Sequence, residues 1–311
     1  MKLKKPDFWD YKKPNLISYL LFPLSLITLL INKFKNRFTK KNLKIKTICV
    51  GNIYLGVTVK TSISLKLNSI LKNFGFKTAF IKKDYSDQID EQRLLKKNGK
   101  LFTDKSRINA LSEAIKNDVQ IAILDDGLQE KKLNYDISFV CFNIENWIGN
   151  GLLLPAGPLR ENLDSLKKYD AVFLNGNDED VLEIKREIKK YNNNLNIFTS
   201  KYTPLENPEI SKNNNYLAFS GIGNPKTFIK TLKKHDFKIV KSLIFPDHYQ
   251  FTSEDIKKIK SKAEEFNAKI ITTEKDFLRL NVDDSNNINY LKIELTIENE
   301  KELINFLKQK L

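Results

Sequence analysis

Short apolar runs alternate with amphipathic stretches along most of this 311-residue chain. Such alternation predicts a mostly parallel sheet whose two faces are both covered by helices. The expected strands of a first unit lie at residues 45–50, 77–81, 120–124, 137–142, 171–174 and 196–199, and its expected helices at 60–73, 107–116 and 180–191. The pattern therefore predicts an α/β fold rather than a helical bundle or an all-β sandwich.

A change of composition divides the chain after this first unit. Residues 203–215 read TPLENPEISKNNN, and this density of Pro and Asn is typical of a linker. A second α/β unit follows, with expected strands at 216–220, 239–244 and 269–272 and expected helices at 226–235 and 253–266. We therefore predict an N-terminal segment at 1–44, a core domain at 45–205, and a smaller C-terminal α/β domain at 206–311.

The N-terminal segment holds most of the excess positive charge. The chain carries a formal charge of +15, of which residues 1–44 contribute +9 through eleven Lys and Arg and two Asp. A uniformly basic surface for nucleic acid would spread this charge over the chain, so we expect no nucleic-acid partner. A basic end beside an apolar stretch instead predicts contact with an anionic membrane surface.

The apolar stretch itself is PNLISYLLFPLSLITLLIN, residues 14–32, with no charged side chain. As a helix it would be about 28 Å long, close to the thickness of a bilayer core, and Pro23 would kink it. Three interpretations remain open: an interfacial or re-entrant helix, a single membrane span, or a helix packed on the soluble body. Basic residues on both flanks favour the interfacial one.

The stretch GNIYLGVTVKTS, residues 51–62, follows the first expected strand and leads into an expected helix. This is the setting of a phosphate-binding loop, and Lys60 and Thr61 supply its usual polar pair. In that setting the lysine reaches the outer phosphates and the threonine binds Mg²⁺. The strict pattern fails, however, because Tyr54 and Val59 stand at the two glycine positions.

Three further stretches carry side chains suited to phosphate chemistry. Asp125 and Asp126 of ILDDGLQ follow an apolar strand, and carboxylates at the carboxyl end of a parallel strand face the crevice where ligands bind. Arg160 ends the shaped loop NGLLLPAGPLRE, where it would stabilise phosphoryl charge. His248 stands beside an aspartate in the turn FPDHYQFT.

Together these stretches resemble one family, the tetraacyldisaccharide 4'-kinases of lipid A biosynthesis. The resemblance runs along nearly the whole chain, in order, through GNIYLGVTVKT, DEQRLL, LDDGLQ, GNGLLLPAGPLRE, AFSGIGNP, FPDHYQFT and TTEKD. It implies a P-loop NTPase-like core and transfer of the γ-phosphate of ATP, with Mg²⁺, to the 4'-hydroxyl of a tetraacylated glucosamine disaccharide 1-phosphate, giving lipid IVA. It also implies work at the cytoplasmic face of the inner membrane, and we expect a monomer.

The resemblance also assigns roles by position. Asp90 matches the catalytic base, His248 the histidine that works with it, and Arg160 the end of the proline-containing loop. The phosphate-loop positions are Gly56, Val57, Thr58, Val59, Lys60 and Thr61, and the expected metal ligands are Thr61, Asp125, Asp126 and Glu91. On this assignment Asp90 comes from the first domain and His248 from the second.

The departures from the family pattern keep a second hypothesis open. The family reads Gly-Gly-Thr-Gly-Lys-Thr where this chain has Val57 and Val59, and a β-branched residue forced to positive φ is strained. The alternative is therefore a catalytically impaired, membrane-associated relative of the kinase that only binds. A third hypothesis, a soluble P-loop enzyme acting on another sugar, is disfavoured by residues 14–32.

Overall fold

The computed structural model describes residues 5–35, 44–56, 59–85, 88–130, 132–176, 181–205, 207, 210–223, 225–247 and 249–311. The chain forms two compact units. The first comprises Met1–Lys83, Gly99–Lys201 and Leu295–Leu311, and the second comprises Asp84–Asn98 and Tyr202–Glu294.

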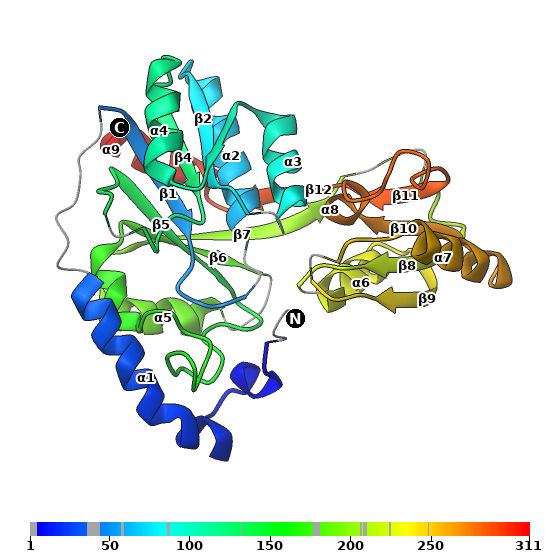
Figure 1. Cartoon of the computed structure of the whole chain (residues 1–311), viewed down its shortest axis with the longest axis horizontal. Helices are drawn as coiled ribbons and strands as arrows, with labels where there is room; N and C mark the ends of the chain where they lie inside the picture. Colours follow the sequence, from blue (N-terminus) through cyan, green and yellow to red (C-terminus); the bar gives the residue numbers. More distant parts are fainter. Residues whose placement is uncertain are drawn as a thin grey trace. The chain divides into compact units, whose positions relative to one another are not determined.

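The first unit is built on an eight-stranded sheet with the order β12-β7-β6-β5-β1-β4-β2-β3 (Figure 1). Its strands are β1 (Lys46–Gly51), β2 (Thr78–Lys83), β3 (Leu101–Asp104), β4 (Ile121–Asp125), β5 (Ile137–Asn143), β6 (Ala171–Asn175), β7 (Asn196–Pro204) and β12 (Ile293–Ile297). From β3 to β7 every neighbouring pair runs parallel. The predicted mostly parallel sheet is therefore confirmed.

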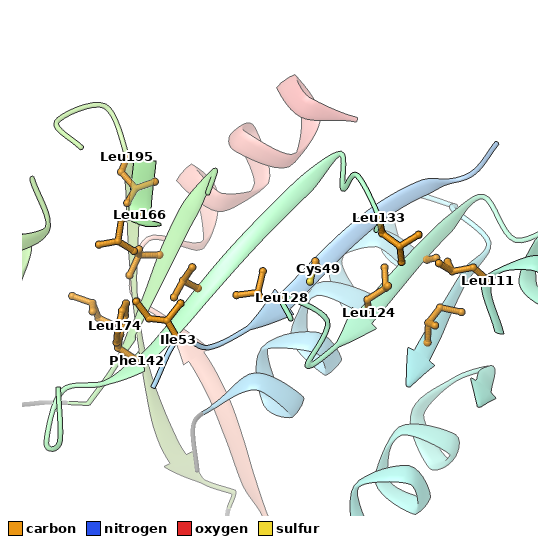
Figure 2. Packing of buried hydrophobic residues seen from close by; sticks show 14 of the residues in the cluster. Cys49, Ile53, Leu111, Leu124, Leu128, Leu133, Phe142, Leu166, Leu174 and Leu195 are labelled. Atoms are coloured by element: carbon orange, nitrogen blue, oxygen red, sulfur yellow. The ribbon is translucent and has the colours of Figure 1, made fainter. Parts of the chain in front are cut away.

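Helices cover both faces of this sheet because its strands are apolar on both sides. On one face a buried cluster joins the strands to α4 (Arg107–Lys116), to the 3₁₀ helix η2 (Leu163–Lys168) and to α5 (Val181–Tyr191) (Figure 2). On the other, α2 (Lys60–Asn73) packs on β1, β2 and β4. There α9 (Glu300–Lys310) inserts Phe306, whose ring centroid lies 5.8 Å from Phe139 and 5.6 Å from Phe198.

The second unit has its own four-stranded parallel sheet, in the order β11-β10-β8-β9. Its strands are β8 (Asn215–Ser220), β9 (Lys238–Ile244), β10 (Lys269–Thr273) and β11 (Ile288–Leu291), and its helices are α3 (Ile89–Asn98), α6 (Pro225–Lys234), α7 (Ser253–Glu265) and α8 (Glu274–Phe277). Thr252 caps α7: its side chain accepts from the Asp255 backbone N–H in a capping box.

The two units differ from the predicted domain ranges in four places. Residues 1–44 fall within the first unit, and residues 202–205 fall within the second. Residues 295–311 return to the first unit, because β12 extends the sheet beside β7 and α9 buries Phe306 among its aromatic side chains. Residues 84–98, predicted within the core domain, belong to the second unit, where α3 contacts α8.

The apolar N-terminal stretch forms a helix, α1 (Leu16–Lys35), that continues through Pro23, preceded by the 3₁₀ helix η1 (Asp7–Asp10). Its polar side chains face the first unit: Ser25 Oγ donates to the Leu153 carbonyl at 2.8 Å and Thr28 Oγ1 to the Leu154 carbonyl at 2.8 Å. Within the described ranges, no helix is both long enough and apolar enough to cross a bilayer.

Candidate active site

The strands β1 and β4 bring the phosphate-loop stretch and the paired carboxylates to one edge of the sheet. Val50, at the end of β1, pairs with Asp125, at the end of β4, and the Asp126 backbone N–H donates to the Val50 carbonyl at 2.8 Å. Because parallel strands share one carboxyl edge, the loop after β1 and the acids after β4 are neighbours. The structure thus brings these two stretches, both assigned to phosphate chemistry from the sequence, to one place.

Lys60 and Thr61 begin helix α2 directly above these carboxylates. Lys60 Nζ lies 2.9 Å from Asp126 Oδ1, and Thr61 Oγ1 donates to Asp125 Oδ2 at 3.3 Å. Val59, the N-cap residue of the 14-residue α2, makes no side-chain hydrogen bond to the start of the helix. A helix N-terminus with an adjacent lysine favours an anionic ligand.

The charges around Asp126 keep it ionised. Burial opposes its ionisation, but Lys60 and then Arg160 outweigh burial and hold the pKa of this carboxyl below its ordinary value. Lys82 lowers this pKa further, and Arg107 Nη2 donates to the backbone carbonyl of Asp126 at 2.7 Å. The Asp126 carboxylate therefore lies beside two cations, Lys60 and Arg160. An anionic phosphate bound nearby can pair with these cations in its place.

Asp125 is fully buried and has a cationic partner that sequence reasoning missed. Lys82, at the end of β2 and 1% exposed, places Nζ 2.6 Å from Asp125 Oδ2. Ser64 Oγ donates to the other carboxylate oxygen at 3.3 Å. The only signal in the sequence was a lysine ending an apolar strand next to β4, and a single lysine carries too little information without the sheet order.

The proline-containing loop is fixed to the phosphate-loop stretch by a short backbone ladder. The Leu55 N–H donates to the Pro158 carbonyl at 2.7 Å, and the Arg160 N–H donates to the Ile53 carbonyl at 2.6 Å. Arg160 Nη1 consequently reaches Gln129 Oε1 at 3.0 Å and lies 3.8 Å from Asp126 Oδ1. The structure thus brings Arg160 together with Lys60, Thr61, Asp125 and Asp126, as predicted.

Val59, one of the residues that departs from the family pattern, adopts an ordinary backbone. Its φ of −69° and ψ of 8° lie far from the left-handed region that favours glycine. Its side chain is 3% exposed, and its carbonyl accepts from the Ile63 N–H at 3.0 Å as α2 begins. The strain expected of a β-branched residue at positive φ is therefore absent at Val59. Val57 and Thr58 lie outside the described residues.

The candidate base Asp90 belongs to the second unit, not to the first as its position in the chain suggested. It begins α3, is fully buried, and accepts from Arg279 Nη2 at 2.7 Å through Oδ2. Glu91, expected among the metal ligands, lies on the same helix with Lys275 Nζ 3.6 Å from its Oε1. The structure therefore does not gather Glu91 with Asp125 and Asp126 in one unit, and His248 lies outside the described residues.

The oxygen donors of the first unit fit a magnesium ion that is shared with a nucleotide. Among the residues described, no group of three His, Cys, Asp or Glu side chains would hold a metal ion by itself. Mg²⁺ in phosphate-transfer sites needs only one or two carboxylates, a hydroxyl and the phosphates themselves. Thr61, Asp125 and Asp126 supply that set, so the donors match the chemistry that the metal requires.

Comparison with known proteins identifies the family. The sequence model of the tetraacyldisaccharide-1-P 4'-kinase family (LpxK) matches residues 17–311. The tetraacyldisaccharide 4'-kinase of Pelagibacter ubique (strain HTCC1062) is 55% identical over 307 residues, covering 99% of this chain and 98% of that protein. The tetraacyldisaccharide 4'-kinase of Rickettsia bellii (strain OSU 85-389) is 35% identical over 317 residues, covering 96% of both chains.

The fold matches a solved structure over almost its full length. The crystal structure of LpxK from Aquifex aeolicus in complex with ATP superposes with a TM-score of 0.75 at 23% identity, covering 95% of this chain and 99% of that chain. This agreement supports the α/β architecture with two sheets. With the family model spanning residues 17–311 and close relatives along the whole length, the chain belongs to the tetraacyldisaccharide 4'-kinase family.

Proposed function

We propose that this protein transfers the γ-phosphate of ATP to the 4'-hydroxyl of a tetraacylated glucosamine disaccharide 1-phosphate, giving lipid IVA. The observation that carries the proposal is the cluster at the start of α2, where Lys60 pairs with Asp126 at 2.9 Å and Thr61 contacts Asp125 at 3.3 Å. Family membership supplies the substrate class, since the relatives are named for this reaction.

Each residue of the cluster has a defined task in this proposal. The first backbone N–H groups of α2 and Lys60 bind the phosphates, and Arg160 adds positive charge where it develops on the transferred group. Thr61, Asp125 and Asp126 hold Mg²⁺, which neutralises phosphate charge when it is bound. Lys82 pairs directly with Asp125 at 2.6 Å and fixes the direction of its carboxylate. Among the phosphate-loop residues, Gly56 and Val59 flank the anion, and Val57 and Thr58 lie outside the described residues.

The proton of the sugar hydroxyl is accepted by Asp90, which His248 assists. A sugar hydroxyl is a weak nucleophile, so a positioned carboxylate accelerates transfer by taking its proton late in the reaction. In this proposal, the nucleotide residues belong to the first unit and both residues of the acid–base pair belong to the second. The reaction thus depends on residues from both units.

The exposed face of α1 accounts for access to a lipid substrate. The polar side chains Ser18 and Ser25 are buried against the first unit, whereas Leu16, Leu20 and Ile27 are 84%, 79% and 53% exposed. An apolar helix face turned to solvent, beside a basic segment, suits the interface of an anionic membrane. We infer that α1 lies on the cytoplasmic face of the inner membrane.

Removing this apolar face is expected to weaken membrane binding without unfolding the protein. In the variant Leu16→Ser/Leu20→Ser/Ile27→Ser, co-sedimentation with anionic phospholipid vesicles should fall at least about 10-fold, because three side chains no longer transfer into the interface. The matched control is Val282→Ser, an 85% exposed apolar residue outside α1, which should bind like the native chain. Equal binding by all three proteins would remove α1 from the membrane contact.

The activity is tested with γ-labelled ATP, Mg²⁺ and the disaccharide 1-phosphate in mixed micelles. We expect label in the lipid product, and none when the acceptor already carries a 4'-phosphate. ATP hydrolysis without labelled lipid, or labelling of both acceptors, would contradict the assigned reaction.

A further inference from the structure

In the second unit, the candidate base Asp90 belongs to a buried network of two carboxylates and one guanidinium. Arg279 Nη2 donates to Asp90 Oδ2 at 2.7 Å, and Arg279 Nη1 donates to Asp276 Oδ1, also at 2.7 Å. The side chains of Asp90 and Asp276 are fully buried, and that of Arg279 is 2% exposed. Three charges in such a place carry a large desolvation cost, which good geometry must offset.

The guanidinium is itself held in a fixed orientation. Nη1 donates a second hydrogen bond to the Gly221 carbonyl at 2.7 Å, and the Gly221 N–H donates to Asp276 Oδ1 at 3.0 Å. Thr273 Oγ1 donates to the other oxygen of Asp276 at 2.7 Å. Because the guanidinium is planar, bonds on Nη1 also fix the direction in which Nη2 meets Asp90.

The same network lies against the loop that carries position 248. A Cβ added to Gly221 would lie 3.1 Å from Tyr249 Cβ and 3.2 Å from the Pro246 carbonyl oxygen. Gly221, which accepts from Arg279, therefore lies close to Pro246 and Tyr249, one on each side of that position. Arg279 lies between the helix of the candidate base and the loop of its proposed partner.

Three weaker contacts also hold α3 in the second unit. Lys275 lies 3.6 Å from Glu91, Arg93 donates to the Leu278 carbonyl, and Lys97 lies 2.9 Å from Glu274. These contacts are more exposed than the Arg279 pair, and exposed ion pairs contribute little to stability. They keep the helix in place, but none of them reaches the Asp90 carboxylate.

We propose that Arg279 is a positioning residue for the kinase reaction, holding the Asp90 carboxylate in the orientation in which it meets the acceptor hydroxyl. The inference rests on the proposed function, in which Asp90 is the base. Burial raises the pKa of Asp276, even though Arg279, Thr273 and Gly221 favour its ionised form and Asp90 adds repulsion. The guanidinium thus offsets two buried carboxylates, one of which is the base.

The test compares steady-state kinetics of five variants, with thermal unfolding measured in parallel. Arg279→Met/Asp276→Asn removes the guanidinium together with one carboxylate, so that Asp90 is the one carboxylate of the network left without the guanidinium. We expect kcat to fall about 10–100-fold, as for loss of one charge-assisted hydrogen bond, while KM for ATP changes less than about twofold. Arg279→Lys keeps the charge without the planar fork, so its kcat should lie between those of the double variant and the native chain.

Arg93→Met is the matched control, since it removes another arginine that holds α3 without touching Asp90. Its kcat should stay within about twofold of native. The fourth variant is Asp90→Asn, and the fifth adds the Arg279 and Asp276 substitutions to it. These substitutions should lower kcat less than about twofold below that of Asp90→Asn, because their effect acts through Asp90.

The outcomes separate this inference from the proposed function. Native kcat in a folded Arg279→Met/Asp276→Asn variant, or a full further loss in the Asp90→Asn background, would overturn the positioning role. If Asp90→Asn itself keeps native turnover, the assignment of the base fails instead, and the positioning role fails with it. Should the double variant not fold, Arg279→Lys carries the test, and native kcat in that variant would overturn the inference.

Discussion

Substituting Lys60 with alanine should lower kcat for phosphate transfer by about 10²–10³-fold, as expected when one preorganised cationic donor to a transferring group is removed. The lysine begins α2 and sits 2.9 Å from Asp126, one of the carboxylates that would hold the metal. Folding should be affected less than turnover, because Arg160 and Arg107 still contact Asp126. Turnover is measured with saturating lipid and varied ATP.

The matched control for this change is Lys66→Ala. Lys66 lies on the same helix, but its ammonium pairs at 3.0 Å with Glu300, the first residue of α9. Its kcat should remain within about twofold of native. A Lys60→Ala enzyme as active as the Lys66→Ala control would mean that the start of α2 does not bind the transferred phosphate.

Replacing Asp90 with asparagine is expected to lower kcat by about 10²–10⁴-fold, the usual contribution of a general base. Asparagine keeps the size of the side chain and can still accept a hydrogen bond from Arg279, but it cannot accept the hydroxyl proton. The dissociation constant for ATP should not change, because Lys60 and Thr61 lie in the other unit. Calorimetry with a non-hydrolysable ATP analogue measures this binding directly.

A second carboxylate of the same helix provides the comparison for Asp90. Glu91→Gln removes the adjacent acid, whose carboxylate lies 3.6 Å from Lys275. Its kcat should fall far less than that of Asp90→Asn. Equal losses in the two variants would show that the helix, and not the Asp90 carboxylate, is what turnover requires.

The sequence predicted the regular elements well where their hydrophobic pattern was long. The helices expected at 60–73 and 107–116 have those bounds in the structure, because amphipathic stretches of ten or more residues leave few alternatives. The strands β3 and β11 have only four residues each and were missed. Helix α3 was missed as well, since polar residues dominate its sequence IDEQRLLKKN.

The candidate site was predictable only as far as the order of motifs along the chain. Lys60, Thr61, Asp125, Asp126 and Arg160 meet because β1 and β4 are neighbours, and the motifs that carry these residues mark the ends of those elements. The partners Lys82 and Arg279 were not predictable. Each is paired with an acid far away in sequence, and only the tertiary fold brings such pairs together.

For the phosphate loop, the sequence predicted more backbone strain than the structure has at Val59. Sequence reasoning treated Val59 as a source of backbone strain, yet this residue has φ of −69° and buries its side chain at the start of α2. A valine costs little at a position whose backbone does not need positive φ. The resemblance to the family pattern alone gave no way to know which glycines were conformationally necessary.

The most direct test of the account is phosphate transfer from ATP to the disaccharide lipid by the native chain, measured beside Val57→Gly/Val59→Gly. We predict that the native chain is active and that the double variant gains no more than about twofold in kcat. We also expect it to lose about 1–3 kcal/mol of unfolding free energy, because the buried Val59 side chain is removed. No transfer by the native chain, with activity appearing in the double variant, would contradict the account and identify an impaired phosphate loop.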